Sequence, residues 1–316
     1  IKKDAVEDKK DPGRVEVLEG ARDLYLSFLM KTLPDDFNLR DMKIVLDCAN
    51  GAAFGVAPAL FERLGAGVTA MNTEPNGKNI NLECGSQHTE TLSRRVIEAG
   101  AELGLAFDGD GDRLIAVDEK GQTLTGDQLL TIYAKMLRDG DALKQNIVVS
   151  TIMSNMGFRL ALKDLGIEQA AAKVGDRFVM EEMREREAVL GGEDSGHIIF
   201  MDYHTTGDGL ISALQIVRAL RTFHRPLSEL AGLMTVFPQV LMNVPVSRKG
   251  DISRVPAVAG EIARVESALG ERGRVLVRFS GTEPVCRVMV EGEDRREIEG
   301  YAGRIADKIK QALGGH

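Results

Sequence analysis

The stretch LGLAFDGDGDRLIAV, residues 103–117, holds the pattern that decides the fold: two short apolar runs flank a loop in which carboxylates alternate with glycine. The run from Leu103 to Phe107 is five residues long, which suits a buried strand better than a helix. The apolar run after Arg113 is likewise strand-like. Polar loops at the ends of buried strands are where α/β proteins gather their binding groups. The stretch therefore predicts an α/β fold with a functional site at this loop.

Around this stretch, strand-like and helix-like segments alternate. A first helix is expected to begin at Asp11-Pro12 and to end before Pro34. The elements expected after it are strands near 43–47, 68–71 and 103–107 and helices near 58–64 and 89–99. Such alternation predicts a mixed or parallel sheet with helices on both faces. We therefore expect residues 1–122 to form a three-layer α/β domain that carries the acidic loop.

Two further domains are expected downstream. Residues 123–234 show a similar alternation, which predicts a second three-layer α/β domain with a mixed sheet, although no strong sequence repeat relates it to the first. Its expected elements are strands near 147–149 and 197–201 and helices near 126–138, 156–165, 177–186 and 208–220. Residues 235–316 predict a small α+β domain with a hairpin, in which Pro245 places the first strand at a sheet edge. Its expected elements are strands near 240–246, 275–279 and 285–291 and helices near 258–269 and 296–313.

The composition is that of an ordinary soluble protein, with 43% apolar and 28% charged residues in a chain of 316. Forty basic against 48 acidic residues give a net charge of −8, which disfavours nucleic acid or an anionic membrane as partner. Three cysteines lie far apart in the sequence, so we expect Cys48, Cys84 and Cys286 to be buried apolar residues rather than disulfides or zinc ligands. The charged first residues show no signal-peptide pattern, and the cytoplasm is the expected compartment.

The loop Asp108-Gly109-Asp110-Gly111-Asp112-Arg113 has the composition of a divalent-cation site. Its three carboxylates converge if the backbone turns sharply, and the glycines permit such a turn. Hard oxygen ligands suit magnesium, manganese or calcium rather than zinc. An EF-hand is disfavoured, because Arg113 stands where that motif needs glycine and because the flanks are strands. A solvated acidic turn is the remaining alternative.

A second candidate loop is Arg278-Phe279-Ser280-Gly281-Thr282-Glu283-Pro284, with Arg287 beyond it. The hydroxyls of Ser280 and Thr282 and the backbone N–H groups around Gly281 can donate to phosphate oxygens. Arg278 and Arg287 add fixed positive charge, and guanidinium groups pair with phosphate through two hydrogen bonds. An ordinary hairpin loop tolerates the same residues, so the segment by itself leaves both interpretations open.

A third candidate is GGEDSGH, residues 191–197, in which glycines hold Glu193 and Ser195 in an expected turn. A carboxylate and a hydroxyl are suitable partners for a sugar diol, although a plain polar loop before a strand is an open alternative. Nearby, residues 173–177 place basic groups at a strand-to-helix junction, where helix N–H groups also favour anions. Residues 205–209 similarly open a helix, and a plain helix cap is the open alternative to a functional role.

Together the three loops indicate phosphoryl transfer on a sugar, because that chemistry needs a cation to neutralise charge and groups that hold both ends of the substrate. With these motifs in place, the chain resembles the α-D-phosphohexomutase family over essentially its whole length. DGDGDR resembles the metal loop of that family, GEDSGH its sugar-recognition loop and RFSGTEP its phosphate loop. The three motifs occur in the family order, each in a separate expected domain.

The resemblance implies roles for individual residues, with Mg²⁺ as the cofactor and a phosphosugar as the substrate. The residues concerned are Asp108, Asp110 and Asp112 for magnesium, Arg113 for the reacting phosphoryl group, Glu193 and Ser195 for the sugar hydroxyls, Arg177 as a weaker candidate for substrate contact, and Arg278, Ser280, Gly281, Thr282 and Arg287 for the non-reacting phosphate.

Within the family, several stretches resemble the bacterial enzymes that interconvert glucosamine 6-phosphate and glucosamine 1-phosphate on the way to cell wall precursors. They are DCANGAA, TEPNGKNIN, CGSQH, VGDRFV, GGEDSGHIIF and TTGDGL. Two positions depart from the usual pattern: Phe279 in the phosphate loop, and Asp194, which we expect to add charge near the sugar. A mutase for glucose or mannose phosphates, and a non-catalytic protein that binds sugar phosphates, are the alternatives.

Family members begin with another α/β domain, whose TASHNP-like loop carries the serine that shuttles the phosphoryl group. That motif does not occur in the sequence, and the nearest match, Ser86-Gln87-His88, lacks the following Asn-Pro. We therefore expect the chain to begin where that domain ends, as a fragment or a naturally shortened protein, and to be inactive without it. The sequence does not fix the oligomeric state, and a homodimer is one open arrangement.

Overall fold

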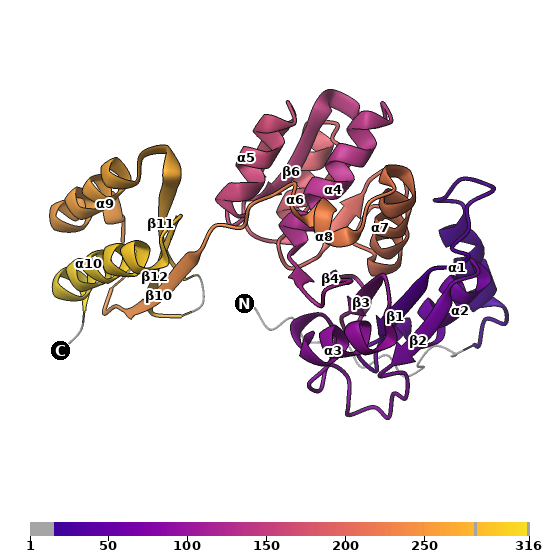
Figure 1. The fold of residues 1–316 in the computed structure, drawn as a ribbon. Helices are drawn as coiled ribbons and strands as arrows, with labels where there is room; N and C mark the ends of the chain where they lie inside the picture. The colour runs from indigo at the N-terminus through magenta and orange to yellow at the C-terminus, as the bar shows by residue number, and fades with distance from the viewer. Residues whose placement is uncertain (1–15, 249, 281–282, 315–316) are drawn as a thin grey trace.

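The computed structural model describes residues 16–248, 250–280 and 283–314, and Figure 1 shows them as three parts that follow one another in sequence order. The first part lies at the right of the view, and the third part, in yellow, lies at the left. The elements of the first part are α1 (Ala21–Met30), β1 (Lys43–Asp47), η1 (Ala52–Gly55), α2 (Ala57–Arg63), β2 (Gly67–Met71), η2 (Gly85–Gln87), α3 (Glu90–Ala99), β3 (Leu103–Phe107), β4 (Leu114–Asp118) and β5 (Thr123–Leu124).

The first sheet has the strand order β2-β1-β3-β4-β5. β1 pairs in parallel with β2 and β3, whereas β4 and β5 run antiparallel to their neighbours. Successive residues of a strand point to opposite faces, and β1 follows this rule. Ile44 packs in the cluster that includes α1 and α2, whereas Val45 packs against Leu92 and Val96 of α3 on the other face. The first part is therefore a three-layer α/β unit with a mixed sheet, as predicted.

The second part repeats this plan. Its elements are α4 (Gly126–Asp139), η3 (Lys144–Asn146), β6 (Ile147–Thr151), α5 (Met156–Asp164), β7 (Glu168–Ala172), α6 (Asp176–Glu185), β8 (Leu190–Gly192), β9 (Ile198–Phe200), α7 (Gly209–Phe223) and α8 (Leu227–Ala231). The strand order β7-β6-β8-β9 and the strand directions match those of β2-β1-β3-β4. The acidic loop between β3 and β4 and the loop between β8 and β9 therefore occupy equivalent places in the two sheets.

One hydrophobic core joins the first two parts. A single cluster of buried residues includes Ile44 of β1, Tyr133 of α4, Val148 of β6 and Leu214 of α7. Tyr133 is fully buried, and its hydroxyl donates to the backbone oxygen of Ser212 on α7 at 2.8 Å. The two units are thus packed against each other, which fixes the loops that they carry.

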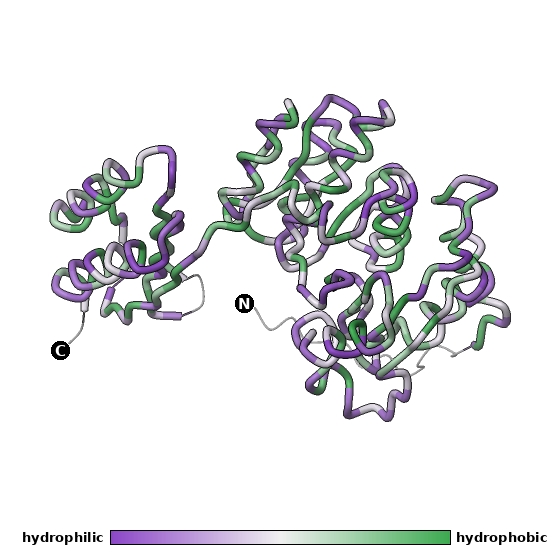
Figure 2. Tube along the Cα trace, in the orientation of Figure 1, coloured by the Kyte–Doolittle hydropathy of each residue, from purple (hydrophilic) through white to green (hydrophobic). Residues whose placement is uncertain are grey.

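The third part has its own core. Its elements are β10 (Gln239–Pro245), η4 (Ile252–Arg254), α9 (Pro256–Leu269), η5 (Gly270–Arg272), β11 (Gly273–Phe279), β12 (Val285–Gly292) and α10 (Arg295–Leu313). The sheet is antiparallel in the order β10-β12-β11, so β10 and its Pro245 lie at an edge, as predicted. Helices α9 and α10 alternate apolar and polar residues along their length (Figure 2), and their apolar sides enclose a separate buried cluster. The fold class expected from the sequence is confirmed.

The first helix is shorter than predicted. The expected start at Asp11-Pro12 lies outside the described residues, and α1 begins only at Ala21. Val17 and Leu18 are 87% and 70% exposed, and Gly20 adopts a left-handed conformation with φ of 75°. Leu18 therefore shows helical spacing in the sequence but has no core to pack against.

The glycines before Glu193 also differ from expectation, because they lie in strand β8 rather than in a turn. Gly191 pairs with Ile199 of β9. A Cβ atom at Gly191 would lie 2.6 Å from the Sδ atom of Met183. This glycine is thus needed for close packing of α6 on the strand, and the turn is restricted to residues 193–197.

The described part of the chain contains no helix that is both long and apolar enough to cross a membrane. Cys48, Cys84 and Cys286 are free and buried, as expected. Burial raises the pKa of the Cys48 thiol to about 12 and that of Cys286 to about 11. These thiols are therefore protonated at neutral pH and serve as packing groups.

Candidate functional site

The acidic loop connects β3 to β4 and is held by the segment that follows β1. The backbone oxygen of Gly109 accepts a hydrogen bond from the Ala52 N–H at 2.8 Å. A tight turn closes between the Asp108 oxygen and the Gly111 N–H at 3.2 Å, and the chain leaves this turn through Gly111, whose φ of 78° is readily adopted by glycine. The DCANGAA motif, which includes Ala52, thus supports the loop rather than supplying ligands.

The three carboxylates of this loop converge as predicted. Asp108, Asp110 and Asp112 each offer an oxygen, and these oxygens lie within 4.8 Å of one another. Asp108 is buried, and burial together with the nearby Asp112 raises its pKa to about 7. Oδ1 of Asp112 is buried and has no hydrogen-bond partner among the described residues. A hard divalent cation fits this donor set, because it would satisfy the free oxygen and favour ionisation of Asp108.

Arg113 lies across two of these carboxylates. Its Nε atom is 3.7 Å from Oδ2 of Asp108 and 3.8 Å from Oδ1 of Asp112. Its backbone N–H donates to Oδ1 of Asp108 at 3.1 Å. The side chain is 38% exposed, so the guanidinium can bind an incoming anion while it stays beside the acidic loop.

His197 joins the acidic loop to the loop between β8 and β9, and the sequence did not reveal this role. Its Nδ1 atom lies 2.9 Å from Oδ2 of Asp112, and its Nε2 atom accepts from the Gly207 N–H at 3.2 Å. Because Nε2 is an acceptor, the proton is on Nδ1, which donates to the Asp112 carboxylate. His197 therefore orients a candidate metal ligand. The signal in the sequence was its place at the end of GEDSGH.

Backbone pairing draws the same loops together. Arg113 and His197 form an isolated antiparallel bridge, and the Leu114 N–H donates to the Gly196 oxygen at 3.1 Å. The Gly209 N–H at the start of α7 donates to the Gly111 oxygen at 2.9 Å. The stretch TTGDGL is thus more than a helix cap, because it also fixes the acidic loop.

The turn after β8 holds the predicted sugar-binding residues. Glu193 is half-buried, and its Oε1 accepts from the Gly175 N–H at 3.0 Å, which leaves Oε2 available. Ser195 is exposed. Arg177 is 81% exposed and pairs with Glu181 on its own helix at 2.8 Å, so its role remains a prediction.

Asp194 points to a different neighbour from the one expected. Its Oδ1 accepts from the Asp127 N–H at 3.2 Å, and its backbone oxygen accepts from the Gly126 N–H at 3.0 Å. The carboxylate thus lies at the N-terminus of α4, where the helix dipole favours negative charge. These hydrogen bonds stabilise the turn, and the effect of Asp194 on charge near the sugar stays a prediction.

The predicted phosphate loop forms the tip of the β11–β12 hairpin. Arg278 and Arg287 are directly opposite in the strand register, an arrangement of like charges that an anion would relieve. Arg287 pairs with Glu283 at 2.8 Å, and Oγ of the buried Ser280 accepts from the Glu283 N–H at 3.2 Å. Gly281 and Thr282 lie outside the described residues.

The hairpin meets the second part of the molecule through the loop between β6 and α5. Met153 of that loop borders a cavity of about 80 Å³ together with Arg278 and Arg287. Arg287 of the hairpin pairs with Glu283 of its own tip, whereas Glu193 is held by the Gly175 N–H and Arg113 lies beside the acidic loop. The acidic loop and the sugar loop are thus in direct contact through His197, whereas the phosphate hairpin packs beside the loop between β6 and α5.

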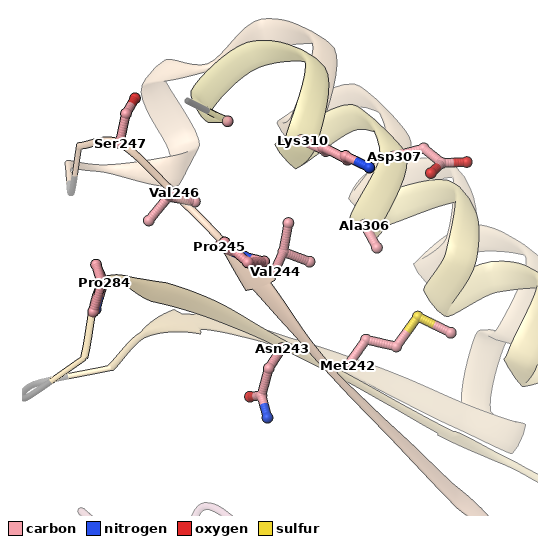
Figure 3. A pocket seen from close by; sticks show the side chains of 11 residues that line it. Met242, Asn243, Val244, Pro245, Val246, Ser247, Pro284, Ala306, Asp307 and Lys310 are labelled. Carbon is pink, nitrogen blue, oxygen red and sulfur yellow. The ribbon is translucent and has the colours of Figure 1, made fainter. Parts of the chain in front are cut away.

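A larger groove of about 710 Å³ lies elsewhere, between β10 and α10 (Figure 3). Val244, Pro245 and Val246 line one side and Ala306 and Lys310 the other. Pro284, at the end of the predicted phosphate loop, also borders the groove, but no described residue to which the sequence assigns a metal, phosphate or sugar role lines it. The groove is therefore treated as separate from the loops that carry the chemistry.

Comparisons with known proteins match all three parts. Models of the phosphoglucomutase/phosphomannomutase family match residues 23–121 as its α/β/α domain II, residues 125–237 as its α/β/α domain III and residues 241–308 as its C-terminal domain. A crystal structure of a family protein from Burkholderia thailandensis superposes with a TM-score of 0.73 at 25% identity, covering 92% of this chain and 64% of that one. N-acetylphosphoglucosamine mutase from Aspergillus fumigatus, solved with GlcNAc-6P and magnesium, shares the fold with a TM-score of 0.72 at 21% identity, covering 90% and 68%.

Curated relatives are more similar in sequence. Phosphoglucosamine mutase from Syntrophobacter fumaroxidans is 53% identical over 302 residues, and that from Syntrophus aciditrophicus is 50% identical over 302 residues. Each alignment covers 96% of this chain and 67% of the relative, so the chain spans about two thirds of the length of these relatives. Since three family models match in order and identity reaches half along nearly the whole chain, the chain belongs to the phosphoglucomutase/phosphomannomutase family.

Proposed function

We propose that this chain is the larger part of a magnesium-dependent mutase that interconverts glucosamine 6-phosphate and glucosamine 1-phosphate. The observation that carries the proposal is the direct contact between the acidic loop and the sugar loop, through His197 and Asp112 at 2.9 Å. This contact brings candidate cation ligands next to candidate sugar ligands. The curated relatives at about half identity are named for this activity, which supports the choice of an amino sugar phosphate.

Each part of the substrate has a proposed partner. Asp108, Asp110 and Asp112 would hold Mg²⁺, which when bound neutralises charge on the transferring phosphoryl oxygens. The guanidinium of Arg113, which lies within 3.8 Å of two of these carboxylates, would bind the same phosphoryl group. Glu193 has one oxygen fixed by the Gly175 N–H, so its other oxygen can accept from a sugar hydroxyl.

The non-reacting phosphate would lie at the hairpin tip. Arg278 and Arg287 face the same point from opposite strands, and Ser280 adds a hydroxyl. We extend the proposal to Gly281 and Thr282 on the strength of the motif alone. Arg177, exposed at the start of α6, is retained as a weaker candidate for substrate contact.

The reaction also needs a group that carries the phosphoryl unit between the two sugar oxygens. We propose a phosphorylated serine in a domain outside these 316 residues. That serine would give its phosphoryl group to the free sugar hydroxyl, whose proton passes to the serine oxygen that is released, and a bisphosphate forms. The phosphate at the other end of the sugar would then return to the serine, so that bonds formed and broken balance. Localisation in the cytoplasm and a homodimeric assembly remain proposals.

Binding measurements test the assignment without the missing serine. We expect the chain, in Mg²⁺, to bind glucosamine 6-phosphate more tightly than inorganic phosphate, because two loops rather than one engage the ligand. Glucose 6-phosphate and mannose 6-phosphate serve as competitors in the same titration calorimetry. Equal affinity for all three sugar phosphates would contradict the amino sugar assignment. Failure of any sugar phosphate to bind better than phosphate would contradict a sugar site altogether.

A further inference from the structure

The hairpin that carries the predicted phosphate loop is held at its base by a partly buried polar contact, which has no role in the proposed chemistry. Arg274 of β11 reaches across to the loop between β6 and α5. Its Nη1 atom donates to the Ile152 oxygen at 3.0 Å, and its Nη2 atom donates to the Ser154 oxygen. One guanidinium thus binds two backbone oxygens of a single loop in another part of the molecule.

Glu291 completes this contact from the neighbouring strand. Its side chain is fully buried, and its Oε2 accepts from Nε of Arg274 at 2.5 Å. Its Oε1 accepts from the Met156 N–H at 2.8 Å, at the first residue of α5, and from Nε2 of Gln239 at 3.1 Å. A buried carboxylate at a helix N-terminus is favoured by the helix dipole. The pair therefore ties β11 and β12 to the start of α5.

The pair stands at the base of the same hairpin whose tip carries the predicted phosphate site. Arg274 is opposite Glu291 in the strand register, and Arg278 is opposite Arg287 four residues further along β11. At about 3.3 Å per residue, the anchor and the arginines of the tip are separated by roughly 13 Å. A small rotation at the base would therefore displace the tip relative to the rest of the molecule.

On its other side, the anchored loop is linked to the sugar loop. The Asn155 N–H donates to Oδ2 of Asp127 at 2.5 Å, and the Asp127 N–H donates to Oδ1 of Asp194 at 3.2 Å. Asp194 is next to Glu193 in the chain. Asn155 also exchanges two hydrogen bonds with the backbone of Phe237, in the connection to β10. Hydrogen bonds thus connect the sugar turn to Asn155, and the next residue, Met156, is bonded to Glu291 at the base of the hairpin.

We propose that Arg274 and Glu291 are positioning residues, which fix the distance between the phosphate-binding hairpin tip and Glu193 so that one sugar phosphate can bridge both. This inference rests on the proposed function, because only a ligand with a phosphate at one end and a sugar at the other senses that distance. Neither residue touches the ligand. Each acts through the loop between β6 and α5.

The two ligands used above distinguish positioning from local binding. Inorganic phosphate needs only the hairpin tip, whereas glucosamine 6-phosphate must engage the tip and the sugar turn together. The test variant is the double substitution Arg274→Met with Glu291→Gln, which removes both charges and leaves no unpaired ion. We expect its affinity for glucosamine 6-phosphate to fall by about tenfold while its affinity for inorganic phosphate stays within about twofold.

Arg274→Lys is the second variant, in case the double variant does not fold. Lysine keeps the charge opposite Glu291 but lacks the fork that binds two carbonyl oxygens at once, so the same selective loss is expected in weaker form. Arg295→Met, which removes an exposed pair with Glu299 at 3.1 Å, is the matched control and should change neither affinity. Arg278→Ala should weaken both ligands, because it removes a group at the tip.

A selective loss of glucosamine 6-phosphate binding supports the positioning role. Equal losses for both ligands, or no loss in a folded Arg274 variant, would overturn it. If the unmodified chain binds glucosamine 6-phosphate no better than phosphate, the proposed function fails first, and that result is separate from the behaviour of the variants.

Discussion

The two carboxylate oxygens of Asp112 have different surroundings. Oδ2 accepts a hydrogen bond from Nδ1 of His197 at 2.9 Å, whereas Oδ1 lies 3.8 Å from Nε of Arg113 and has no hydrogen-bond partner among the described residues. His197 is itself held by the Gly207 N–H at 3.2 Å. The arrangement fixes the rotamer of Asp112 and leaves one oxygen free for a cation, as outer partners do in metal sites.

Removal of His197 should therefore weaken cation binding without removing a ligand. We expect His197→Ala to reduce Mg²⁺ affinity by about 10- to 100-fold, the usual effect of losing an outer-shell partner. His197→Asn, whose amide can still donate toward Asp112, should restore part of that loss. Isothermal titration with Mg²⁺ measures both, and the exposed His88→Ala serves as control. Unchanged affinity in His197→Ala would show that Asp112 is oriented by other contacts.

Substitution of a carboxylate should have the larger effect. Asp110 is the exposed member of the three, so Asp110→Asn removes one negative charge with little change in packing. We expect Mg²⁺ uptake to be lost or strongly weakened, because the remaining two carboxylates give a weaker field. Titration calorimetry of both proteins at equal ionic strength is the measurement. Identical Mg²⁺ binding by the two would remove the metal-loop interpretation.

The positions of the three aspartates could be predicted from the sequence, whereas the partners of Asp194 and His197 could not. The identity of the three aspartates and the turn-forming glycines was enough to predict their convergence, because a short loop limits where its own side chains can go. The partners of Asp194 and His197 were not predictable, because the N-terminus of α4 and the acidic loop lie 67 and 85 residues away in sequence. Their contacts depend on how the two sheets pack.

Among the helices and strands, those formed by continuous buried apolar runs were predicted most accurately from the sequence. The strands Lys43–Asp47 and Leu103–Phe107 were predicted to the residue, because each is a continuous apolar run closed by polar residues. β7 (Glu168–Ala172) was missed because its sequence EQAAA lacks β-branched and aromatic residues. β8 was missed because its last two residues are glycines, which only the packing of α6 explains. Tertiary contacts, rather than local propensity, made these two segments strands.

The N-termini of α4 and α5 meet at Asp127, and this meeting makes stability depend on pH. The Asp127 side chain is buried. Its burial, and to a smaller extent the negative charge of Asp194, raise the pKa of Asp127 to about 7. An unfolded aspartate has a pKa of about 4. Between about pH 4 and pH 7 the folded state thus binds more protons than the unfolded state, so this group's stabilising contribution falls as pH rises.

Asp127→Asn should remove this dependence. We expect the variant to lose less stability than the unmodified chain between about pH 5 and about pH 8, because its amide stays neutral throughout. Urea unfolding with EDTA present at both pH values gives the comparison, and EDTA prevents any cation from contributing. The exposed Asp141→Asn is the control. Parallel pH profiles for Asp127→Asn and the unmodified chain would show that Asp127 is already ionised when folded.

At the scale of the whole molecule, the loops of the predicted site are carried by two separate hydrophobic cores. The acidic and sugar loops belong to two sheets that share one core, whereas the phosphate hairpin belongs to a third part with its own core. Order of the motifs along the chain was visible in the sequence. Their distances were not, because those depend on the shared core and on the contact of Arg274 with the loop between β6 and α5. The site is therefore a product of packing between parts, and each part alone supplies only one end of it.

The same view of the molecule leads to the prediction that these 316 residues alone have no mutase activity. A mutase takes a phosphoryl group from one sugar oxygen and returns it to another, so it needs a covalent carrier between the two steps. The acidic loop and Arg113 can stabilise transferred charge but cannot hold the group. Ser280 is buried in the hairpin loop, and its Oγ already accepts from the Glu283 N–H, while Ser195 is assigned to the sugar.

The purified chain would be assayed with glucosamine 6-phosphate, Mg²⁺ and a bisphosphate primer, with formation of glucosamine 1-phosphate as the readout. We expect no turnover above background from the chain alone, and turnover when the serine-bearing domain of a curated relative is joined to its N-terminus. Asp110→Asn in the joined protein should abolish that activity, because the carrier serine still needs the cation to stabilise charge on the transferred group. Turnover by the chain alone would mean that one of its own serines can be phosphorylated, and phosphopeptide mapping after incubation with the primer would then identify that serine.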